Sequence, residues 1–96
     1  MRGIALFSIV QKEKRCWVCG VDHGLEIHHI FGGVANRRIS EKYGLKVWLC
    51  AEHHRGDNGA QYNPELNREL KRQAQAAFET VYGHDKWMAL MMKNYL

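Results

Sequence analysis

The chain contains little proline, few cysteines and no long apolar run. No stretch approaches the ~18 apolar residues of a membrane-spanning helix, so we expect no membrane partner. Three cysteines cannot all pair within one chain, which argues against a secreted, disulfide-stabilised scaffold and favours metal binding. The opening "MRGIALFSIVQKEKR" has only a short apolar run and no small-residue cleavage site after it, so a signal peptide is not expected.

Acidic residues are fewer than basic ones, 10 against 14, which gives a formal net charge of +4. A moderate basic excess is compatible with a polyanionic partner but does not require one. The length of 96 residues, with 46% hydrophobic and 25% charged residues, predicts a single globular domain over 1–96. A core of this size is modest, so an additional cross-link would help to stabilise it.

Two short strands are predicted in the N-terminal half. Residues 25–30, "LEIHHI", and 45–50, "LKVWLC", alternate loosely and contain β-branched side chains. The connection 34–44, "VANRRISEKYG", is polar and basic, with room for about one helical turn. Residues 4–10, "IALFSIV", fit either a strand or the start of a buried helix, because periodicity cannot decide at that length.

The C-terminal part, 63–96, is predicted to be helical. Asn63 suits the N-cap of a long helix, Pro64 its first turn and Gly83 its end. An apolar stripe recurs at spacings of three or four: Leu66, Leu70, Ala74, Ala77, Phe78 and Val81. A shorter helix over 84–96 should pack on the first through Trp87, Leu90, Met91 and Leu96. This part is interpreted as scaffold, with a dimer contact as the alternative.

Four candidate ligands follow the pattern C-x2-C…C-x2-H: Cys16, Cys19, Cys50 and His53. Two closely spaced pairs supply the tetrahedral set that Zn²⁺ prefers, and four protein ligands leave no position open for water, so the predicted zinc is structural. The alternative is three buried thiols and a surface histidine. A redox role for "CWVC" is disfavoured, because thioredoxin-like motifs sit in a βαβ context that this chain lacks.

The histidines form two doublets, His28-His29 and His53-His54. Neighbouring side chains on a helix diverge by ~100°, so His53 can face the zinc while His54 faces a different site. Neighbours on a strand point to opposite faces, and two can serve one centre only near a strand end, which Gly32-Gly33 provides. We therefore expect the side chains of His28 and His54 to converge, with His29 beside them. The alternative is a buried histidine pair with satisfied hydrogen bonds.

The combination "CWVCG…IHHI…WLCAEHH", within residues 16–58, resembles the HNH endonucleases, also called His-Me finger or ββα-metal nucleases. The resemblance implies an α+β fold: a ββα-metal core closed by a structural zinc knuckle, followed here by a long C-terminal helix and a shorter helix. It implies a metal-dependent DNA endonuclease that hydrolyses phosphodiester bonds. The chain is also similar to small phage and prophage members, which implies the cytoplasm of a bacterial host, DNA as partner, and a possible homodimer or phage protein partner.

The same resemblance assigns roles to individual residues. His28 and His54 match ligands of a catalytic divalent ion, which the family leads us to expect is Mg²⁺ or another divalent ion, and His29 matches the general base. Asn58 lies four residues after His54, where the family often has another ligand, in a stretch, "RGDNG", that does not favour a helix. Where the family usually has its middle asparagine this chain has Leu45, and the nearest substitute for orienting His29 is Asn36.

Basic residues near these motifs are candidates for contacts with DNA phosphates. Arg37 and Arg38 lie between the two halves of the site, and further basic residues lie before the knuckle and along the long helix: Lys12, Lys14, Arg15, Arg68, Lys71 and Arg72. Each of these could equally be a solvated surface charge. The competing interpretation of the whole chain is a non-catalytic zinc-knuckle module that binds nucleic acid or protein, as a degenerate nuclease would.

Overall fold

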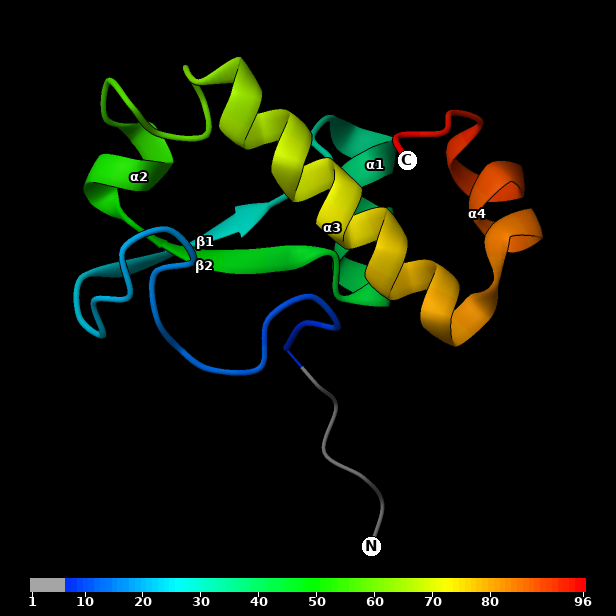
Figure 1. Ribbon diagram of the computed structural model, residues 1–96, viewed down its shortest axis with the longest axis horizontal. Coiled ribbons are helices and arrows are strands. Elements are labelled where there is room, and N and C mark those ends of the chain that lie inside the picture. Colours follow the sequence, from blue (N-terminus) through cyan, green and yellow to red (C-terminus); the bar gives the residue numbers. More distant parts are fainter. Residues whose placement is uncertain (1–6) are drawn as a thin grey trace, which may run out of the picture.

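The computed structural model describes residues 7–96, which form a mixed arrangement of helices and strands (Figure 1). In chain order the elements are β1 (Leu25–His29), α1 (Val34–Tyr43), β2 (Lys46–Cys50), α2 (Ala51–Arg55), α3 (Pro64–Tyr82) and α4 (His84–Met91). Of the segment 4–10, residues 4–6 lie outside the described part, and residues 7–10 belong to neither a helix nor a strand.

The two strands pair antiparallel, with Leu25 opposite Cys50 and His29 opposite Lys46. Both lie where the apolar alternation predicted them, to within one residue at each end. The pleat of β2 buries the side chains of Val47 and Leu49 completely, because alternate residues of a strand face the same side. This register places His29 and Lys46 beside each other at the end of the sheet that adjoins α1.

The connection 34–44 was predicted to be polar with about one helical turn, but it forms the ten-residue helix α1. Its buried side is narrow, and at its centre the hydroxyl of Ser40 donates to the Phe31 carbonyl at 3.1 Å and accepts from the Phe31 N–H at 3.2 Å. The helix ends at Gly44, whose φ of 70° is left-handed and whose N–H bonds to the Ser40 carbonyl. A buried serine gives no apolar signal, which is why the periodicity missed this helix.

The long helix α3 begins as predicted. The Asn63 side chain accepts hydrogen bonds from the backbone N–H groups of Glu65 and Leu66, at 3.1 and 3.2 Å. The centre of the predicted stripe is buried, at Leu70, Ala74 and Phe78, whereas Val81 at its end is 59% exposed.

Helix α4 is shorter than the predicted span 84–96. It ends at Met91, and Met92 adopts a left-handed conformation with φ of 59°. Trp87 is fully buried as expected, but Leu96 is 59% exposed, so its expected packing is wrong. The indole of Trp87 donates to the Lys93 carbonyl at 2.8 Å, and this bond folds the last residues back towards the helix.

The hydrophobic core lies between β2 and the two C-terminal helices, and α3 runs across the sheet in Figure 1. The Trp87 ring meets Phe31 and Phe78 edge-on, with centroids 5.4 and 5.3 Å apart. Between residues 7 and 96, no helix combines the length and the hydropathy needed to cross a membrane.

Candidate metal centre and histidine site

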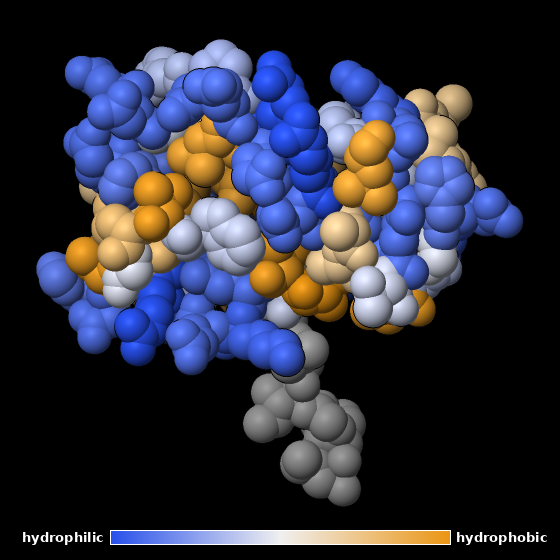
Figure 2. Space-filling model, in the orientation of Figure 1, coloured by the Kyte–Doolittle hydropathy of each residue, from blue (hydrophilic) through white to orange (hydrophobic). Residues whose placement is uncertain are grey.

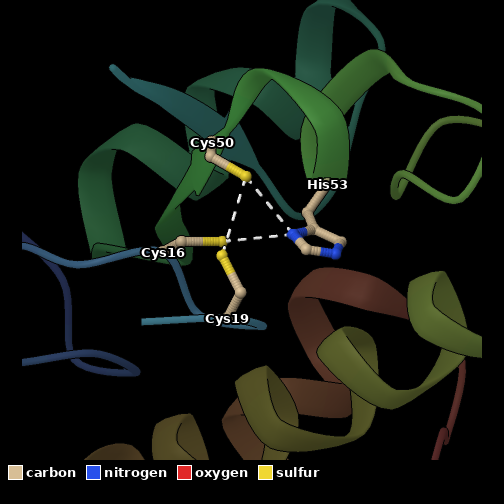
Figure 3. A group of neighbouring side chains, drawn as sticks. All are labelled: Cys16, Cys19, Cys50 and His53. Carbon is tan, nitrogen blue, oxygen red and sulfur yellow. Dashed lines mark hydrogen bonds between the residues drawn. The ribbon is translucent and has the colours of Figure 1, made fainter. Parts of the chain in front are cut away.

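Four predicted ligands meet in what we call the Cys3His cluster, formed by Cys16, Cys19, Cys50 and His53 (Figure 3). The His53 Nδ1 lies 3.3 Å from the Cys50 Sγ and 3.7 Å from the Cys16 Sγ, and the Cys19 and Cys50 sulfurs are 3.9 Å apart. A tetrahedral zinc ion, with bonds of about 2.3 Å to sulfur and 2.0–2.1 Å to nitrogen, separates its donors by roughly 3.5–3.8 Å. The cluster is therefore positioned to hold a metal ion.

Local backbone bonds set these donors in place. The Cys16 N–H bonds to the Val21 carbonyl at 2.8 Å, and the Gly20 N–H bonds to the Cys16 carbonyl at 2.9 Å, which closes the turn carrying two of the sulfurs. The Trp17 N–H bonds to the Trp48 carbonyl at 2.8 Å and so fixes the turn against β2. Cys50 ends β2 and caps α2, which brings the second pair of donors to the same point.

The electrostatics of the sulfurs suit a cation. Burial opposes ionisation of the Cys16 thiol, but backbone hydrogen bonds from Cys19 and Cys50 outweigh it and lower its pKa to about 6. Burial raises the pKa of Cys50, and the adjacent charge of Cys16 raises it further. Several sulfurs at this distance repel one another once ionised, and a divalent cation removes that repulsion.

The second histidine of the doublet points away from the cluster, as expected for neighbours on a helix. The Nδ1 of His54 bonds to the Glu26 carboxylate at 2.8 Å, whereas His53 faces the sulfurs. The chain then folds back tightly, because the Ala60 N–H bonds to the His53 carbonyl at 2.8 Å. Gly59 permits this approach, since a Cβ there would lie 2.8 Å from the backbone carbon of His54.

The expected convergence of His28 and His54 is present. Their rings meet edge-on, with centroids 5.2 Å apart and planes at 71°. His28 is only 8% exposed, and its Nε2 is a buried polar atom without a hydrogen-bond partner among the described residues. Burial is the main reason that the pKa of His28 falls to about 4, and the nearby charges of His54 and Lys71 add to the effect. The imidazole is thus held neutral, the form that binds metals.

A carboxylate fixes the orientation of His54. Glu26 lies two residues before His28 on β1, and therefore on the same face of the strand. It accepts from both Nε and Nη2 of Arg55, at 3.1 and 2.9 Å, and contacts His54. The Arg55 bonds, followed by the His54 bond, lower the pKa of Glu26 to about 2. This ionised carboxylate holds Nδ1 of His54 and leaves Nε2 free, an arrangement common among metal-binding histidines.

The ring of His29 has a carboxylate partner of its own. Its Nε2 lies 2.8 Å from the Glu41 carboxylate, which also accepts from the Lys46 ammonium at 2.7 Å. Bonds from Lys46 and then His29 lower the pKa of Glu41 to about 2. A groove of about 450 Å³ opens beside this contact, lined by His29, Glu41, Val34, Arg37 and Arg38. Both predicted phosphate-binding arginines therefore lie along the groove that contains His29.

Two other positions differ from the roles expected of them. Asn36 is exposed in the first turn of α1, and Glu41 contacts the His29 ring in the place expected for it. Helix α2 ends at Arg55, so Asn58 lies in the following turn and lacks the helical spacing to His54. Leu45, which stands where the family usually has its middle asparagine, is fully buried in the core.

The sequence interpretation missed Glu26 and Glu41, the carboxylates that hold His54 and His29. The position of Glu26 could have been predicted, since Glu26 and His28 are two residues apart on a strand and therefore share a face. The position of Glu41 could be predicted only if 34–43 is recognised as a helix, because Glu41 then lies one turn after Arg37 and Arg38.

Comparisons with known proteins add no relative. No protein-family model matches the chain, and neither the curated proteins nor the solved structures contain a match.

Proposed function

We propose that this protein is a metal-dependent DNA endonuclease of the HNH type. The observation that carries the proposal is the histidine pair: His28 is buried with an unpartnered Nε2, and its ring lies edge-on to His54 at 5.2 Å. In this proposal β1, β2 and α2 form the ββα-metal core, and His28 and His54 hold the catalytic ion.

The spacing of the two rings supports a shared ion. Two imidazoles bound to one ion at about 2.1 Å, at an angle between a right angle and a tetrahedral one, place their centroids roughly 4.5–5.5 Å apart. The observed separation falls inside this range. Two protein ligands leave most positions for phosphate and water, which suits Mg²⁺ or Mn²⁺ in a phosphodiesterase.

The Cys3His cluster is proposed to hold a structural zinc ion. Its three sulfurs and one imidazole nitrogen are the donor types that Zn²⁺ prefers, and four is the number of donors that a structural zinc ion takes. Because His53 and His54 are adjacent, an ion at the cluster would fix the start of α2 and thereby the position of His54.

The protein groups supply the acid–base chemistry. His29 takes a proton from the attacking water at Nδ1, the ring nitrogen that Glu41 leaves free. Glu41 holds the ring and stabilises the imidazolium, and Lys46 keeps that carboxylate ionised. Arg37 and Arg38 bind neighbouring phosphates along the groove. A divalent ion held by His28 and His54 would supply Lewis-acid stabilisation of the charge that develops on the phosphate and the leaving 3′ oxygen.

One observation favours a second candidate, a non-catalytic zinc-knuckle module. Among residues 7–96, the Cys3His cluster is the only group of three or more cysteine, histidine or acidic side chains close enough to share an ion. The histidine site has two such ligands. A protein that keeps the zinc but has lost the catalytic ion would have one complete set of metal ligands and one incomplete set, as this chain does.

Supercoiled plasmid incubated with the pure protein distinguishes the two candidates. An endonuclease should convert the plasmid to nicked or linear forms when Mg²⁺ or Mn²⁺ is added. It should leave the plasmid supercoiled when structural zinc is the only metal present. His28→Ala and His54→Ala should lose this activity, while His84→Ala, an exposed histidine on α4, should keep it. Intact plasmid with every divalent ion would reject the endonuclease and leave the binding module.

A further inference from the structure

A second groove, of about 490 Å³, lies between the loop 60–63, the first turns of α3 and the C-terminal residues 93–95. We call it the basic groove, because the charged side chains that line it are Arg68, Lys71 and Lys93, and none of its lining residues is acidic. Nothing in the proposed mechanism uses these residues. Figure 2 shows hydrophilic side chains over much of the surface around α3, with smaller apolar areas between them.

The three cations are available to a ligand. Within residues 7–96, no ion pair joins Arg68, Lys71 or Lys93 to a carboxylate, whereas Arg72 pairs with Glu69 at 3.2 Å. The ammonium of Lys71 lies 5.7 Å from the Tyr95 ring centroid, and that of Lys93 lies 5.1 Å from it. These ring contacts orient the ammonium groups but do not neutralise them.

The groove adjoins the histidine site. Its loop wall is bonded to α2, since the Gln61 N–H contacts the His54 carbonyl at 3.3 Å. Lys71 also lies 5.8 Å from the ring of Phe31, two residues after His29. An extended chain of phosphates that reaches the histidine site can therefore continue into the basic groove.

Other lining groups suit a nucleic acid better than an isolated anion. The amide side chains of Asn63, Asn67 and Asn94 supply N–H donors beside the cations, and Tyr62 is 67% exposed, so its ring offers a surface for base stacking. The first turn of α3, a 19-residue helix, also contributes the positive end of its dipole.

We infer that the basic groove binds the sugar–phosphate backbone of DNA next to the cleavage site, with Arg68, Lys71 and Lys93 each contacting phosphate. The choice of DNA as the polyanion rests on the proposed function. The groove itself lies outside the motif region 16–58 and is built by the C-terminal half of the chain.

Fluorescence anisotropy with a labelled duplex of about 20 base pairs, without a catalytic ion, tests this directly. The groove variant is Arg68→Gln, Lys71→Gln and Lys93→Gln together. The control is Lys42→Gln with Lys86→Gln, two lysines that also lie over tyrosine rings, as Lys71 and Lys93 do, but outside the groove. Circular dichroism establishes that both variants fold.

The groove variant should lower the slope of log affinity against log salt by about 2–3, and its affinity near ~0.1 M salt should fall roughly 100-fold. The control should change the slope by less than about 1 and the affinity by less than about fivefold. Equal losses in both variants, an unchanged groove variant, or no binding by the unmodified protein would each overturn the inference. Binding through the groove without plasmid cleavage would reject only the proposed endonuclease.

Discussion

Replacing Cys19 with serine removes one donor from the Cys3His cluster without opening a cavity, because this side chain is exposed. The loss of stability therefore reports the loss of the metal and not of packing. The control is Val18→Ser, which changes a neighbour in the same turn that is also exposed, at 44%, and is not a ligand.

The size of the effect follows from the chain that the metal closes. The cluster joins Cys19 to Cys50 and Cys16 to His53, pairs that are 31 and 37 positions apart. Cross-linking a loop of this length restricts the unfolded chain by roughly 4 kcal/mol. For a domain below 100 residues, a change of about 1 kcal/mol moves the thermal midpoint by about 4–8 °C. Cys19→Ser should therefore lower the midpoint by roughly 15–30 °C.

Thermal unfolding by circular dichroism, with metal analysis on the same samples, measures both quantities. We expect about one zinc ion per chain in the unmodified protein and in Val18→Ser, and markedly less in Cys19→Ser. A Cys19→Ser protein that melts within about 3 °C of the control would show that no metal at the cluster stabilises the fold, and so would an unmodified protein that folds fully without metal.

Three further perturbations test separate parts of the structure. The pKa of His28 is about 4 in the folded protein and near 6.5 in the unfolded chain, so the unfolded chain binds a proton more readily. The free energy of unfolding should therefore decrease as the pH is lowered from about 6.5 to about 4, by up to roughly 3 kcal/mol. Denaturant unfolding of His28→Gln should lose this dependence, and retaining it would contradict the assignment. Gly59→Ala should shift α2 and destabilise the fold by more than 1 kcal/mol, since its Cβ would meet backbone at 2.8 Å; unchanged urea unfolding would count against this. Gln75→Met removes buried bonds to Glu79, Asn94 and the Tyr95 N–H, so hydrogen exchange at Tyr95 should accelerate and stability should drop by about 1–3 kcal/mol. A protected Tyr95 amide would show that other contacts hold this terminus.

The sequence predicted those features that depend on local pattern. Alternation located both strands, and the Asn63 cap with its following stripe located α3. The ligands of the Cys3His cluster could be predicted because zinc imposes short, repeated spacings on them. The divergence of His53 and His54 follows from helix geometry alone.

Features that depend on tertiary contacts were not predicted. Helix α1 is held by the buried hydroxyl of Ser40, whose partner Phe31 lies outside the helix. The contact with the His29 ring that was expected of Asn36 is made by Glu41, because α1 turns that carboxylate, and not the amide, towards His29. The early end of α4 follows from the bond between the Trp87 indole and the Lys93 carbonyl, which a helical pattern does not reveal.

In the proposed mechanism, His29, held by Glu41, is the general base of a phosphodiesterase. The most direct measurement is the nicking rate of supercoiled plasmid by His29→Ala under saturating Mg²⁺ or Mn²⁺, compared with His23→Ala, an exposed histidine in the loop before β1. We expect a loss on the order of 10²–10⁴-fold for His29→Ala, with zinc content and fold retained, and no loss for His23→Ala. Nicking by His29→Ala at the rate of the unmodified protein would show that His29 is not the general base.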